Sequence, residues 1–503
     1  MPDTTITKAV TAAWKSGEAF KDIAPPNGYM PYLLTIFFIK YISDLPRGVE
    51  DAEFPESGGH DSVGEVTIRA GGRFVLPSDC TFHALYDQRH IPDNAARIDA
   101  ALAKLTRNNV KTLEGIFDTI HFSGLAPNDE SLRDEVLRSL LEAFAKPGLK
   151  LAPLLSEQPD RVGEVFELLL HRFALAAGRT EAAFHTPPEL ANLITELVSP
   201  GAGETVYDPA CGSGSFLIRC AKYIQEHENT KDYRLYGQER TENVSALAKI
   251  NLLIHGEDCD HLEHGDVIQN PKHLVNKNKL QQFDVVVSNP PYSIESWPYE
   301  FAQHDPFGRF GFGVPPKTRG NFALILHMIA SMKDRSGRTA VIVPQGVLFR
   351  GANEADIRKK LIQDNLVDAV IELPEKLLYN TPIPLSVLIL RRDKVDSNVL
   401  FVDASEDYVY GRTQNSLASE HIGVIAETYR IRRSVPGRSS LVGNEKIMAN
   451  AANLSIALYV ERPKKNVIRD VAAVNKERKR IKKNLSALDL QISETLRSMG
   501  YDI

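Results

Sequence analysis

The stretch VVVSNPPYSI, residues 285–294, contains a short apolar run that ends abruptly at a polar motif. Three consecutive valines are typical of a strand that is buried on both faces in a parallel sheet. Pro290 and Pro291 cannot continue such a strand, because proline lacks a backbone N–H and fixes φ. The sequence therefore predicts that a carboxamide, Asn289, and a phenol, Tyr292, stand at the carboxyl end of a buried strand.

Similar short apolar runs surround this stretch, and helical patterns separate them. The runs span residues 204–208, 234–239, 283–289, 338–344, 366–374 and 385–392, with helical patterns such as 215–227 and 321–333 between them. Alternating strands and helices predict βαβ units around a buried parallel sheet, and hence an α/β fold. In such sheets ligands bind at the carboxyl ends of the strands, which is where the motifs described below fall.

The chain is too long for a single core, and its patterns divide it into three parts. It has 503 residues and 43% hydrophobic content, which predicts two or three globular domains. We expect an α-helical domain at residues 1–155, an α/β domain at residues 156–460 and a helical tail at residues 461–503. Apolar residues at helical spacing predict helices in the first part, as at residues 32–44 and 131–146. Nothing in this first part has a catalytic pattern.

Cysteine usage and the length of the apolar runs indicate where the protein works. No run approaches the roughly 20 residues that a membrane helix needs. The polar N-terminus lacks the layout of a signal peptide. Cys80, Cys211, Cys220 and Cys259 form no CxxC pair and have no metal-ligand spacing. We therefore expect reduced thiols, no metal site, no membrane partner and a cytoplasmic location.

Charge is distributed unevenly along the chain. The formal net charge is −6, but residues 461–483 hold ten Lys or Arg and three Asp or Glu, a local charge of +7 that leaves −13 for the rest. A basic segment on an acidic body can contact nucleic acid or a partner protein. A solvated helix face is the alternative explanation of the same charges.

A second candidate motif is the turn YDPACGSGSFLI, residues 207–218. A predicted strand ends at Asp208 and leads into a helix through Gly212 and Gly214, which allow the backbone to turn tightly and to approach a ligand. The dinucleotide fingerprint would require a third glycine where Leu217 stands, and no P-loop lysine follows. The turn is therefore either a ligand-binding turn of another kind or a structural connection.

Two carboxylates follow at the ends of later strands. Glu239 ends the next predicted strand and could accept hydrogen bonds from both ribose hydroxyls of a nucleoside. Asp266, in the sequence HGD, could accept a hydrogen bond from the amino group of a base. Each signal is weak alone, because an ordinary surface carboxylate would look the same.

The combination of DPACGSGSFL with SNPPY at this spacing resembles the S-adenosylmethionine-dependent N6-adenine DNA methyltransferases. More specifically, residues 166–198 are similar to the segment that precedes the glycine turn in modification subunits of type I restriction-modification systems. Residues 373–392 resemble a later motif of that family, and residues 32–44 resemble its helical domain. The resemblance thus covers nearly the whole chain, and the paired motifs that carry it are highly specific.

This resemblance implies a Rossmann-like, seven-stranded methyltransferase domain, preceded by the α-helical domain and followed by the helical tail. It also implies that S-adenosylmethionine is the cofactor. Carried over to this sequence, the family's cofactor-binding positions are Ala183, Phe184, His185, Thr186, Pro187, Pro188, Asp208, Pro209, Ala210, Gly212, Ser213, Gly214, Ser215, Glu239, Asp266 and Asn289.

The resemblance also gives the motif from Asn289 to Tyr292 a catalytic role. The exocyclic amine of adenine is a poor nucleophile, because its lone pair is delocalised into the ring. The Asn289 side-chain oxygen and the Pro290 carbonyl could accept hydrogen bonds from both hydrogens of that amine, and Pro291 would fix the direction of the carbonyl. Tyr292 would stack on a base extruded from the duplex. A strand-end turn without a function is the alternative.

The sequence departs from the family pattern in two places. The usual Phe/Tyr-Thr-Pro-Arg run reads Phe184-His185-Thr186-Pro187-Pro188 here, and loss of the arginine puts in doubt any charged contact from position 188. Where the family often has Phe-Tyr-Gly-Thr, this chain has Leu378-Tyr379-Asn380-Thr381. A second base-stacking aromatic would therefore be Tyr379, for which a half-buried packing role is the alternative.

Other classes of methyltransferase fit the sequence less well. A cytosine-C5 enzyme needs a Pro-Cys dipeptide, and none of the four cysteines follows a proline. N4-cytosine enzymes usually carry Ser-Pro-Pro-Tyr, so Asn289 favours adenine. Glutamine methyltransferases that act on proteins share Asn-Pro-Pro-Tyr but are far shorter. Two alternatives stay open: a self-sufficient adenine or N4-cytosine DNA methyltransferase, and a non-catalytic binding subunit with a methyltransferase fold.

The expected partners follow from what the chain lacks. Only about 100 residues follow the last predicted strand, and they are low in motifs that read bases. In the resembled family a separate specificity subunit reads the DNA sequence. The resemblance therefore implies double-stranded DNA, a specificity subunit that binds two copies of this chain, and a restriction/translocase subunit as partners.

Two further segments carry predictions. A heptad seam in the tail predicts a docking site for the specificity subunit, with folding back on its own chain as the alternative; the seam residues are Val467, Val471, Val474, Ile481, Leu485, Leu488 and Ile492. Residues 293–322 form a long loop rich in glycine, phenylalanine and basic residues. We interpret this loop as a flap that orders on DNA, and a disordered insertion is the alternative.

Overall fold

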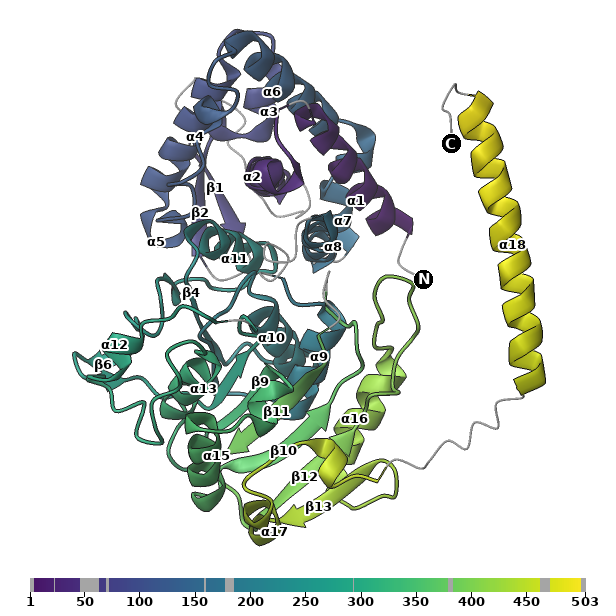
Figure 1. Cartoon of the computed structure of the whole chain (residues 1–503). Helices are drawn as coiled ribbons and strands as arrows, with labels where there is room; N and C mark the ends of the chain where they lie inside the picture. Colours follow the sequence, from purple (N-terminus) through teal and green to yellow (C-terminus); the bar gives the residue numbers. More distant parts are fainter. Residues whose placement is uncertain are drawn as a thin grey trace. The chain divides into compact units, whose positions relative to one another are not determined.

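The computed structural model of the protein describes residues 4–21, 23–45, 63–68, 72–157, 160–176, 185–292, 294–378, 383–461 and 471–498. The chain divides into two compact units, Met1–Val460 and Glu461–Ile503. The first unit contains a helical region followed by a large sheet with helices on both faces, and the second contains one long helix (Figure 1).

Helices make up most of the N-terminal region. They are α1 (Thr4–Ser16), α2 (Pro26–Asp44), α3 (Phe82–Asp87), α4 (Asn94–Asn108), α5 (Val110–Leu113), α6 (Glu130–Phe144), α7 (Ala152–Glu157) and α8 (Asp160–Ala176). The predicted helices at 32–44 and 131–146 are confirmed as α2 and α6. Helix α2 is apolar on all sides, and Leu33, Phe37 and Phe38 are fully buried, as expected of a helix enclosed by others. Figure 1 shows α1, α3, α6 and α8 around it.

The N-terminal region also contains a hairpin that the sequence patterns did not predict. Strands β1 (Val63–Ile68) and β2 (Gly72–Pro77) pair antiparallel. Its polar and apolar residues do not alternate strictly, so a period-two pattern was not visible in the sequence.

The central sheet has nine strands in the order β13-β12-β10-β11-β9-β8-β3-β4-β5. Their bounds are β3 (Thr205–Asp208), β4 (Arg234–Glu239), β5 (Leu262–His264), β8 (Val285–Ser288), β9 (Arg338–Pro344), β10 (Val367–Glu372), β11 (Leu385–Arg391), β12 (Asn398–Asp403) and β13 (Ser439–Gly443). The six predicted strands are all present. The seven strands from β5 to β10 form the expected seven-stranded sheet, and β12 and β13 extend it.

The sheet is mostly parallel, as expected, and two of its strands run antiparallel to their neighbours. Strand β11 lies antiparallel to both β10 and β9, and β13 lies antiparallel to β12. The connection from β10 to β11 contains no helix among its described residues, whereas a parallel pair is usually joined by a helical crossover. The other neighbours in the sheet are parallel, so the carboxyl ends of β3, β4, β5, β8, β9, β10 and β12 meet at one edge.

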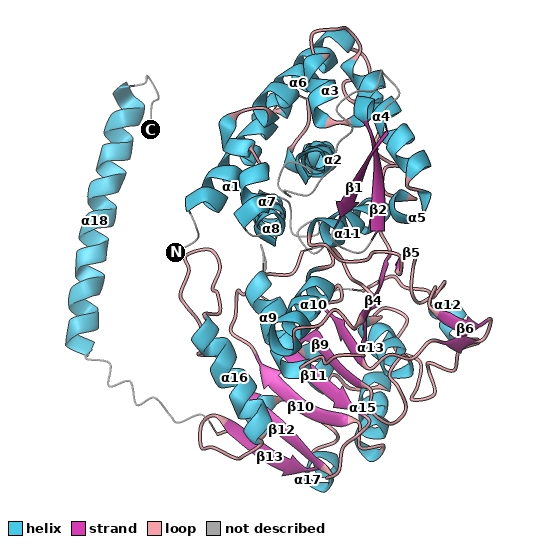
Figure 2. Cartoon of the chain, turned by 180° about the vertical axis from the view of Figure 1, so that it is seen from behind, coloured by secondary structure: helices cyan, strands magenta, loops and turns pink. Residues whose placement is uncertain are grey.

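Helices cover both faces of the sheet (Figure 2). They are α9 (Pro188–Val198), α10 (Ser215–Glu228), α11 (Glu242–Ile254), α13 (Asn321–Ala330), α14 (Gly346–Phe349), α15 (Asn353–Gln363), α16 (Ser419–Ile431) and α17 (Asn444–Ala449). Side chains of successive strand residues enter different cores, with Val285 and Val287 in one and Val286 in the other. The first of these cores continues into the N-terminal helices, so the helical region and one face of the sheet are packed together.

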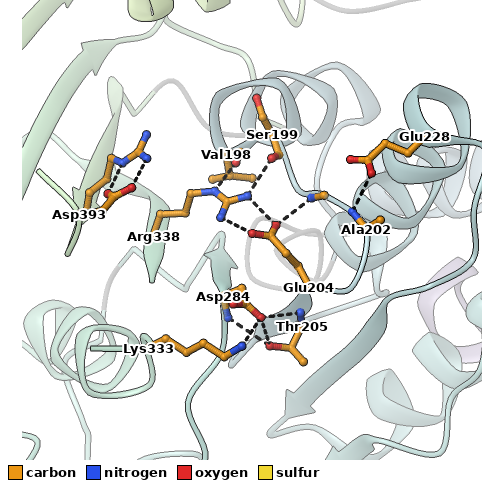
Figure 3. Close-up of polar contacts among 12 residues, drawn as sticks. Val198, Ser199, Ala202, Glu204, Thr205, Glu228, Asp284, Lys333, Arg338 and Asp393 are labelled. Carbon is orange, nitrogen blue, oxygen red and sulfur yellow. Dashed lines mark hydrogen bonds and ion pairs between the residues drawn. The ribbon is translucent and has the colours of Figure 1, made fainter. Parts of the chain in front are cut away.

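The amino edge of the sheet is closed by charged side chains (Figure 3). At the start of β9, Arg338 pairs with Glu204 through two contacts of 2.8 and 2.7 Å. Asp284, which precedes β8, accepts from the backbone N–H of Thr205 at 2.9 Å and pairs with Lys333 at 2.7 Å. These contacts fix the registers of β3, β8 and β9, and therefore the positions of the residues at their opposite ends.

The loop after β8 is folded. Its described residues include α12 (Tyr299–Ala302), and a small hairpin of β6 (Leu274–Asn276) and β7 (Lys279–Leu280) precedes β8. Arg309, whose side chain is fully buried, pairs with Asp305 at 2.7 Å and donates to the carbonyl oxygens of Val267 at 3.0 Å and Ile268 at 2.6 Å. The described residues of this loop are therefore not a disordered insertion, and a movement of the loop on DNA stays a prediction.

The second unit consists of α18 (Val471–Ser498), a helix of 28 residues. Four predicted seam residues, Ile481, Leu485, Leu488 and Ile492, have exposed fractions of 50–61%. Val467 and the side chains of Val471 and Val474 lie outside the described residues. In the part of the chain that the structure describes, no helix has both the length and the apolar character to cross a membrane.

Candidate active site at the carboxyl edge of the sheet

A cavity of about 990 Å³ opens at the carboxyl edge of the sheet. Ligand pockets usually measure roughly 300–1,000 Å³, so this cavity lies at the upper end of the range. The structure brings seven of the predicted site residues to its wall: Pro209, Ala210, Gly212, Glu239, Asp266, Asn289 and Pro291. They come from the ends of four strands, as expected for a ligand site in an α/β sheet.

The glycine turn between β3 and α10 needs its glycines. Gly212 and Gly214 have φ values of +54° and +81°, which L side chains rarely adopt. A Cβ atom at Gly214 would come within 2.6 Å of Leu252 Cδ1 on α11. The backbone N–H of Gly212 donates to Glu239 Oε2 at 3.0 Å, which ties the turn to the end of β4.

Both predicted carboxylates are held in place by backbone N–H groups. Besides Gly212, Glu239 accepts from the N–H of Thr241 at 2.8 Å. Asp266 Oδ1 accepts from the N–H of Ile268 at 2.9 Å, and its other oxygen lies 3.6 Å from Arg240 Nε. Each carboxylate therefore presents oxygen atoms to the cavity in a fixed orientation.

Asp208 supports the site from beneath and lies outside the cavity wall. It is buried, and its Oδ1 accepts from the N–H of Ala210 at 3.0 Å and from Ser288 Oγ at 2.9 Å. The contact between Asp208 and Ser288 joins the ends of β3 and β8. Burial raises the pKa of the Asp208 carboxyl to about 7.

The predicted segment before α9 joins the glycine turn to the Asn289 motif. His185 Nδ1 lies 2.9 Å from Ser213 Oγ, and burial lowers the pKa of His185 to about 4. Thr186 Oγ1 accepts from Asn289 Nδ2 at 3.0 Å. Pro188, where the family pattern has arginine, is the first residue of α9, a position that favours proline. Ala183 and Phe184 lie outside the described residues.

The side chains of Asn289 and Tyr292 are in contact. The Tyr292 hydroxyl donates to Asn289 Oδ1, while Asn289 Nδ2 donates to Thr186. Pro290 is buried and Pro291 is exposed. Burial raises the pKa of the Tyr292 phenol, so it stays protonated as a donor near neutral pH. Tyr379, the second predicted stacking residue, lies outside the described residues.

Several residues of the cavity wall were not predicted from the sequence. Met30 and Pro31 of α2 and Phe173 of α8 line it, as do Ile294 and Trp297 of the loop after β8. These side chains look like ordinary core residues in the sequence, and no motif marks them. The helical region therefore contributes to the site, although its sequence has no catalytic pattern.

The described residues contain no cluster of three or more His, Cys, Asp or Glu side chains that could hold a metal ion. The four cysteines are buried thiols.

Two family models match the chain. The model described as N-6 DNA Methylase matches residues 157–467, and the model described as HsdM N-terminal domain matches residues 10–144. The first match covers the whole sheet and the cavity wall except Met30 and Pro31, and the second covers those two residues and most of the helical region.

Relatives and solved structures agree with these models. The chain is 30% identical over 444 residues to the type I restriction enzyme MjaVIII methylase subunit of Methanocaldococcus jannaschii, covering 85% of this chain and 74% of that protein. It is 33% identical over 339 residues to the HindI methylase subunit of Haemophilus influenzae, covering 66% and 74%. Its structure resembles the type I restriction-modification methyltransferase subunit of Streptococcus thermophilus, with a TM-score of 0.77, 25% identity and coverage of 91% and 100%.

Proposed function

The chain belongs to the N-6 DNA methylase family, as a methylase subunit of the type I restriction-modification kind, and from this premise we propose that its cavity binds S-adenosylmethionine beside a target adenine. Members of this family methylate DNA at adenine N6, so the chain is an adenine-specific DNA methyltransferase. The proposal concerns the residues that perform this reaction and the partners that bring DNA to them.

The cavity fits S-adenosylmethionine. Glu239 and Asp266 offer carboxylate oxygens to the ribose hydroxyls and to the amino group of the adenine ring, and the turn at Gly212 lets the backbone approach the ligand closely. The remaining volume leaves room for a base next to the cofactor. When bound, S-adenosylmethionine supplies a methyl group activated by a sulfonium. Two contacts outside the cavity wall support the pocket. Asp208 contacts Ser288 at the end of β8, and His185 contacts Ser213 in the glycine turn.

The Asn289 motif activates the target amine. Because Asn289 Nδ2 donates to Thr186, Oδ1 is the atom that can accept a hydrogen bond from the amine. The Pro290 carbonyl accepts from the second hydrogen, and the two acceptors together free the nitrogen lone pair. Tyr292 stacks on the extruded base. No strong base is needed before transfer, because the amine loses its proton after it becomes cationic. Positioning and electrostatic stabilisation therefore carry most of the rate enhancement.

The partners are assigned by analogy with the relatives, which are named as subunits of type I restriction enzymes. We infer that the chain acts on double-stranded DNA in a complex with a specificity subunit, two copies of this chain to each, and with a restriction/translocase subunit. The tail at 461–503 provides the dock. Action on cellular DNA places the complex in the cytoplasm.

The observation that carries this proposal is that Gly212, Glu239, Asp266 and Asn289, which are far apart in the sequence, line one cavity. The test is transfer of labelled methyl groups to DNA by the chain alone and by the chain co-purified with its specificity subunit. We expect N6-methyladenine, identified by mass spectrometry of digested DNA, from the complex only. Methylation by the chain alone would support a self-sufficient enzyme, and absence of transfer by both would contradict the proposal.

A further inference from the structure

The N-cap and the first residue of α13 hold the backbone that follows the Asn289 motif. The N–H of Gly320 donates to the carbonyl oxygen of Ile294 at 2.8 Å, and Asn321 Nδ2 donates to the carbonyl oxygen of Tyr292 at 3.0 Å. Asn321 is buried, with an exposed fraction of 6%. The backbone is thus held at Tyr292 and again at Ile294 by a helix that lies about thirty residues further along the chain.

An arginine fixes which way the Asn321 carboxamide points. Arg350 Nη1 lies 3.5 Å from Asn321 Oδ1 and 3.6 Å from the buried carboxylate of Glu354. Because a guanidinium only donates, the carboxamide oxygen must face Arg350 and the nitrogen must face Tyr292. Gly346 makes room for this arrangement, since a Cβ atom there would come within 2.5 Å of Arg350 Nε.

The same helix start shapes the cavity wall. A Cβ atom at Gly320 would lie 2.7 Å from Ile294 Cγ2 and 2.8 Å from Trp297 Cγ, and both of these residues line the cavity. Ala323 and Leu324, in the first turn of α13, line it too. Asn321 thus lies among residues of the cavity wall, and its side chain donates a hydrogen bond to the main chain of Tyr292.

We propose that Asn321 is a positioning residue for the target base. By holding the carbonyl of Tyr292, it sets the position of the Tyr292 ring beside Asn289, and Arg350 holds Asn321 in turn. The inference rests on the proposed function of the Asn289 motif and deepens it. A displacement of about 1 Å at a reacting site can reduce the rate by about 10²-fold, so loss of this contact should affect the turnover of bound DNA.

The chain offers a closely matched control in Asn94. This residue is the first of α4, as Asn321 is the first of α13, and it is buried with an exposed fraction of 3%. Its Nδ2 donates to a backbone carbonyl, that of Arg89, at 3.0 Å, and its Oδ1 accepts from Arg97 at 2.8 Å. Asn94→Ala therefore removes the same set of contacts in the helical region, where no contact with Tyr292 is involved.

The experiment compares Asn321→Ala, Asn94→Ala and wild type in the complex with the specificity subunit. We expect Asn321→Ala to lower kcat by about 10- to 100-fold, with the Kd for S-adenosylmethionine changed less than about twofold. Asn94→Ala should lose a similar amount of thermal stability and keep its kcat. DNA with 2-aminopurine at the target adenine provides a second measurement, and Asn321→Ala should give a smaller emission change on binding than wild type.

Asn321→Asp keeps the size of the side chain and serves if the alanine variant folds poorly. Its carboxylate pairs with Arg350 but cannot donate to the Tyr292 carbonyl, so we expect the same loss of kcat. A kcat equal to that of Asn94→Ala in either folded variant would overturn the positioning role. A wild-type complex that does not methylate adenine would instead overturn the proposed function, so the two failures are distinguishable.

Discussion

The hydroxyl of Tyr292 donates a hydrogen bond to the side-chain oxygen of Asn289, the atom to which the proposed mechanism assigns a hydrogen of the target amine. The Asn289 nitrogen is engaged by Thr186 at 3.0 Å, so its oxygen cannot be turned away without losing that contact. In the proposed mechanism the target amine therefore meets an Asn289 oxygen that already accepts one hydrogen bond and has a second lone pair to offer. We therefore expect the Tyr292 ring to contribute to base binding by stacking, and its hydroxyl to contribute only the hydrogen bond to Asn289.

We predict that Asn289→Ala and Tyr292→Ala abolish methylation while S-adenosylmethionine still binds. Asn289→Ala removes an acceptor for the target amine, and Tyr292→Ala removes the surface on which the extruded base stacks. Methyl transfer from labelled cofactor and calorimetric titration of the cofactor measure the two effects separately.

Tyr292→Phe is the matched control for this prediction. It keeps the ring and removes only the hydroxyl that contacts Asn289, so the variant should retain activity within about an order of magnitude of wild type. Wild-type turnover in Tyr292→Ala would show that the base binds elsewhere.

We predict that Gly212→Val and Glu239→Ala weaken binding of S-adenosylmethionine. Valine cannot adopt the φ of +54° at position 212 without strain, and alanine at position 239 leaves the N–H groups of Gly212 and Thr241 without their acceptor. Glu239→Ala also removes the hydrogen bonds that we propose to the ribose hydroxyls; a loss of about 1–3 kcal/mol in binding corresponds to a Kd raised by roughly 5- to 150-fold in calorimetry.

Glu228→Ala is the control for Glu239→Ala. Glu228 also accepts from a backbone N–H, that of Ala202 at 3.2 Å, but it lies with the charged side chains at the amino edge of the sheet (Figure 3). We expect no change in its cofactor affinity. If Gly212→Val and Glu239→Ala both bind the cofactor as wild type does, the pocket is not the one described.

The pKa of His185 leads to a prediction about pH. Burial lowers it to about 4 in the folded protein, against about 6.5 in an unfolded chain. The unfolded state therefore binds the proton more readily, and the stability contributed by the neutral ring is present above pH 6.5 and lost as the pH falls toward 4. The slope from this group approaches about 1.4 kcal/mol per pH unit.

Urea unfolding between pH 5 and pH 7 measures this contribution. His185→Gln retains a polar group for the contact with Ser213 but takes up no proton, so its free energy of unfolding should depend less on pH than that of wild type. Parallel pH dependences of the two proteins would contradict the assigned pKa. Contributions from other buried histidines cancel in the comparison.

The sequence predicted those parts of the fold and site that depend on local pattern. Strands β3, β4 and β8 are short apolar runs that end in a polar residue, and the cavity forms where they end. Strand β5 was not predicted, because Leu262 is the one apolar residue among its three residues. The contribution of Met30 and Phe173 depends on how the helical region packs against the sheet, and no local pattern encodes that contact.

The tail provides a surface for the last prediction. Ile481, Leu485, Leu488 and Ile492 follow one another at four-, three- and four-residue steps on α18, and each is exposed by at least 50%. Burial of such a side chain contributes roughly 1.5–3 kcal/mol. We therefore expect a partner to cover this row of apolar side chains. A heptad seam specifies the partner's form, which is one or more helices that bring a complementary seam.

We predict that truncation after Pro463 leaves a folded subunit that binds S-adenosylmethionine but no longer assembles with the specificity subunit. The first compact unit ends at Val460, so the cut removes none of its core. A second variant tests the seam residues independently of the basic residues that flank them. Leu485→Asp with Leu488→Asp should also abolish assembly, because burying charged side chains in a helical seam has a large free-energy cost. The matched change of two basic residues, Lys482→Ala with Lys483→Ala, should slow association at low salt but leave the complex intact.

Size-exclusion chromatography of each variant mixed with the specificity subunit measures assembly, and calorimetry with S-adenosylmethionine reports whether the subunit is folded. A complex of normal size and stability from the truncated chain would show that the seam is not the dock.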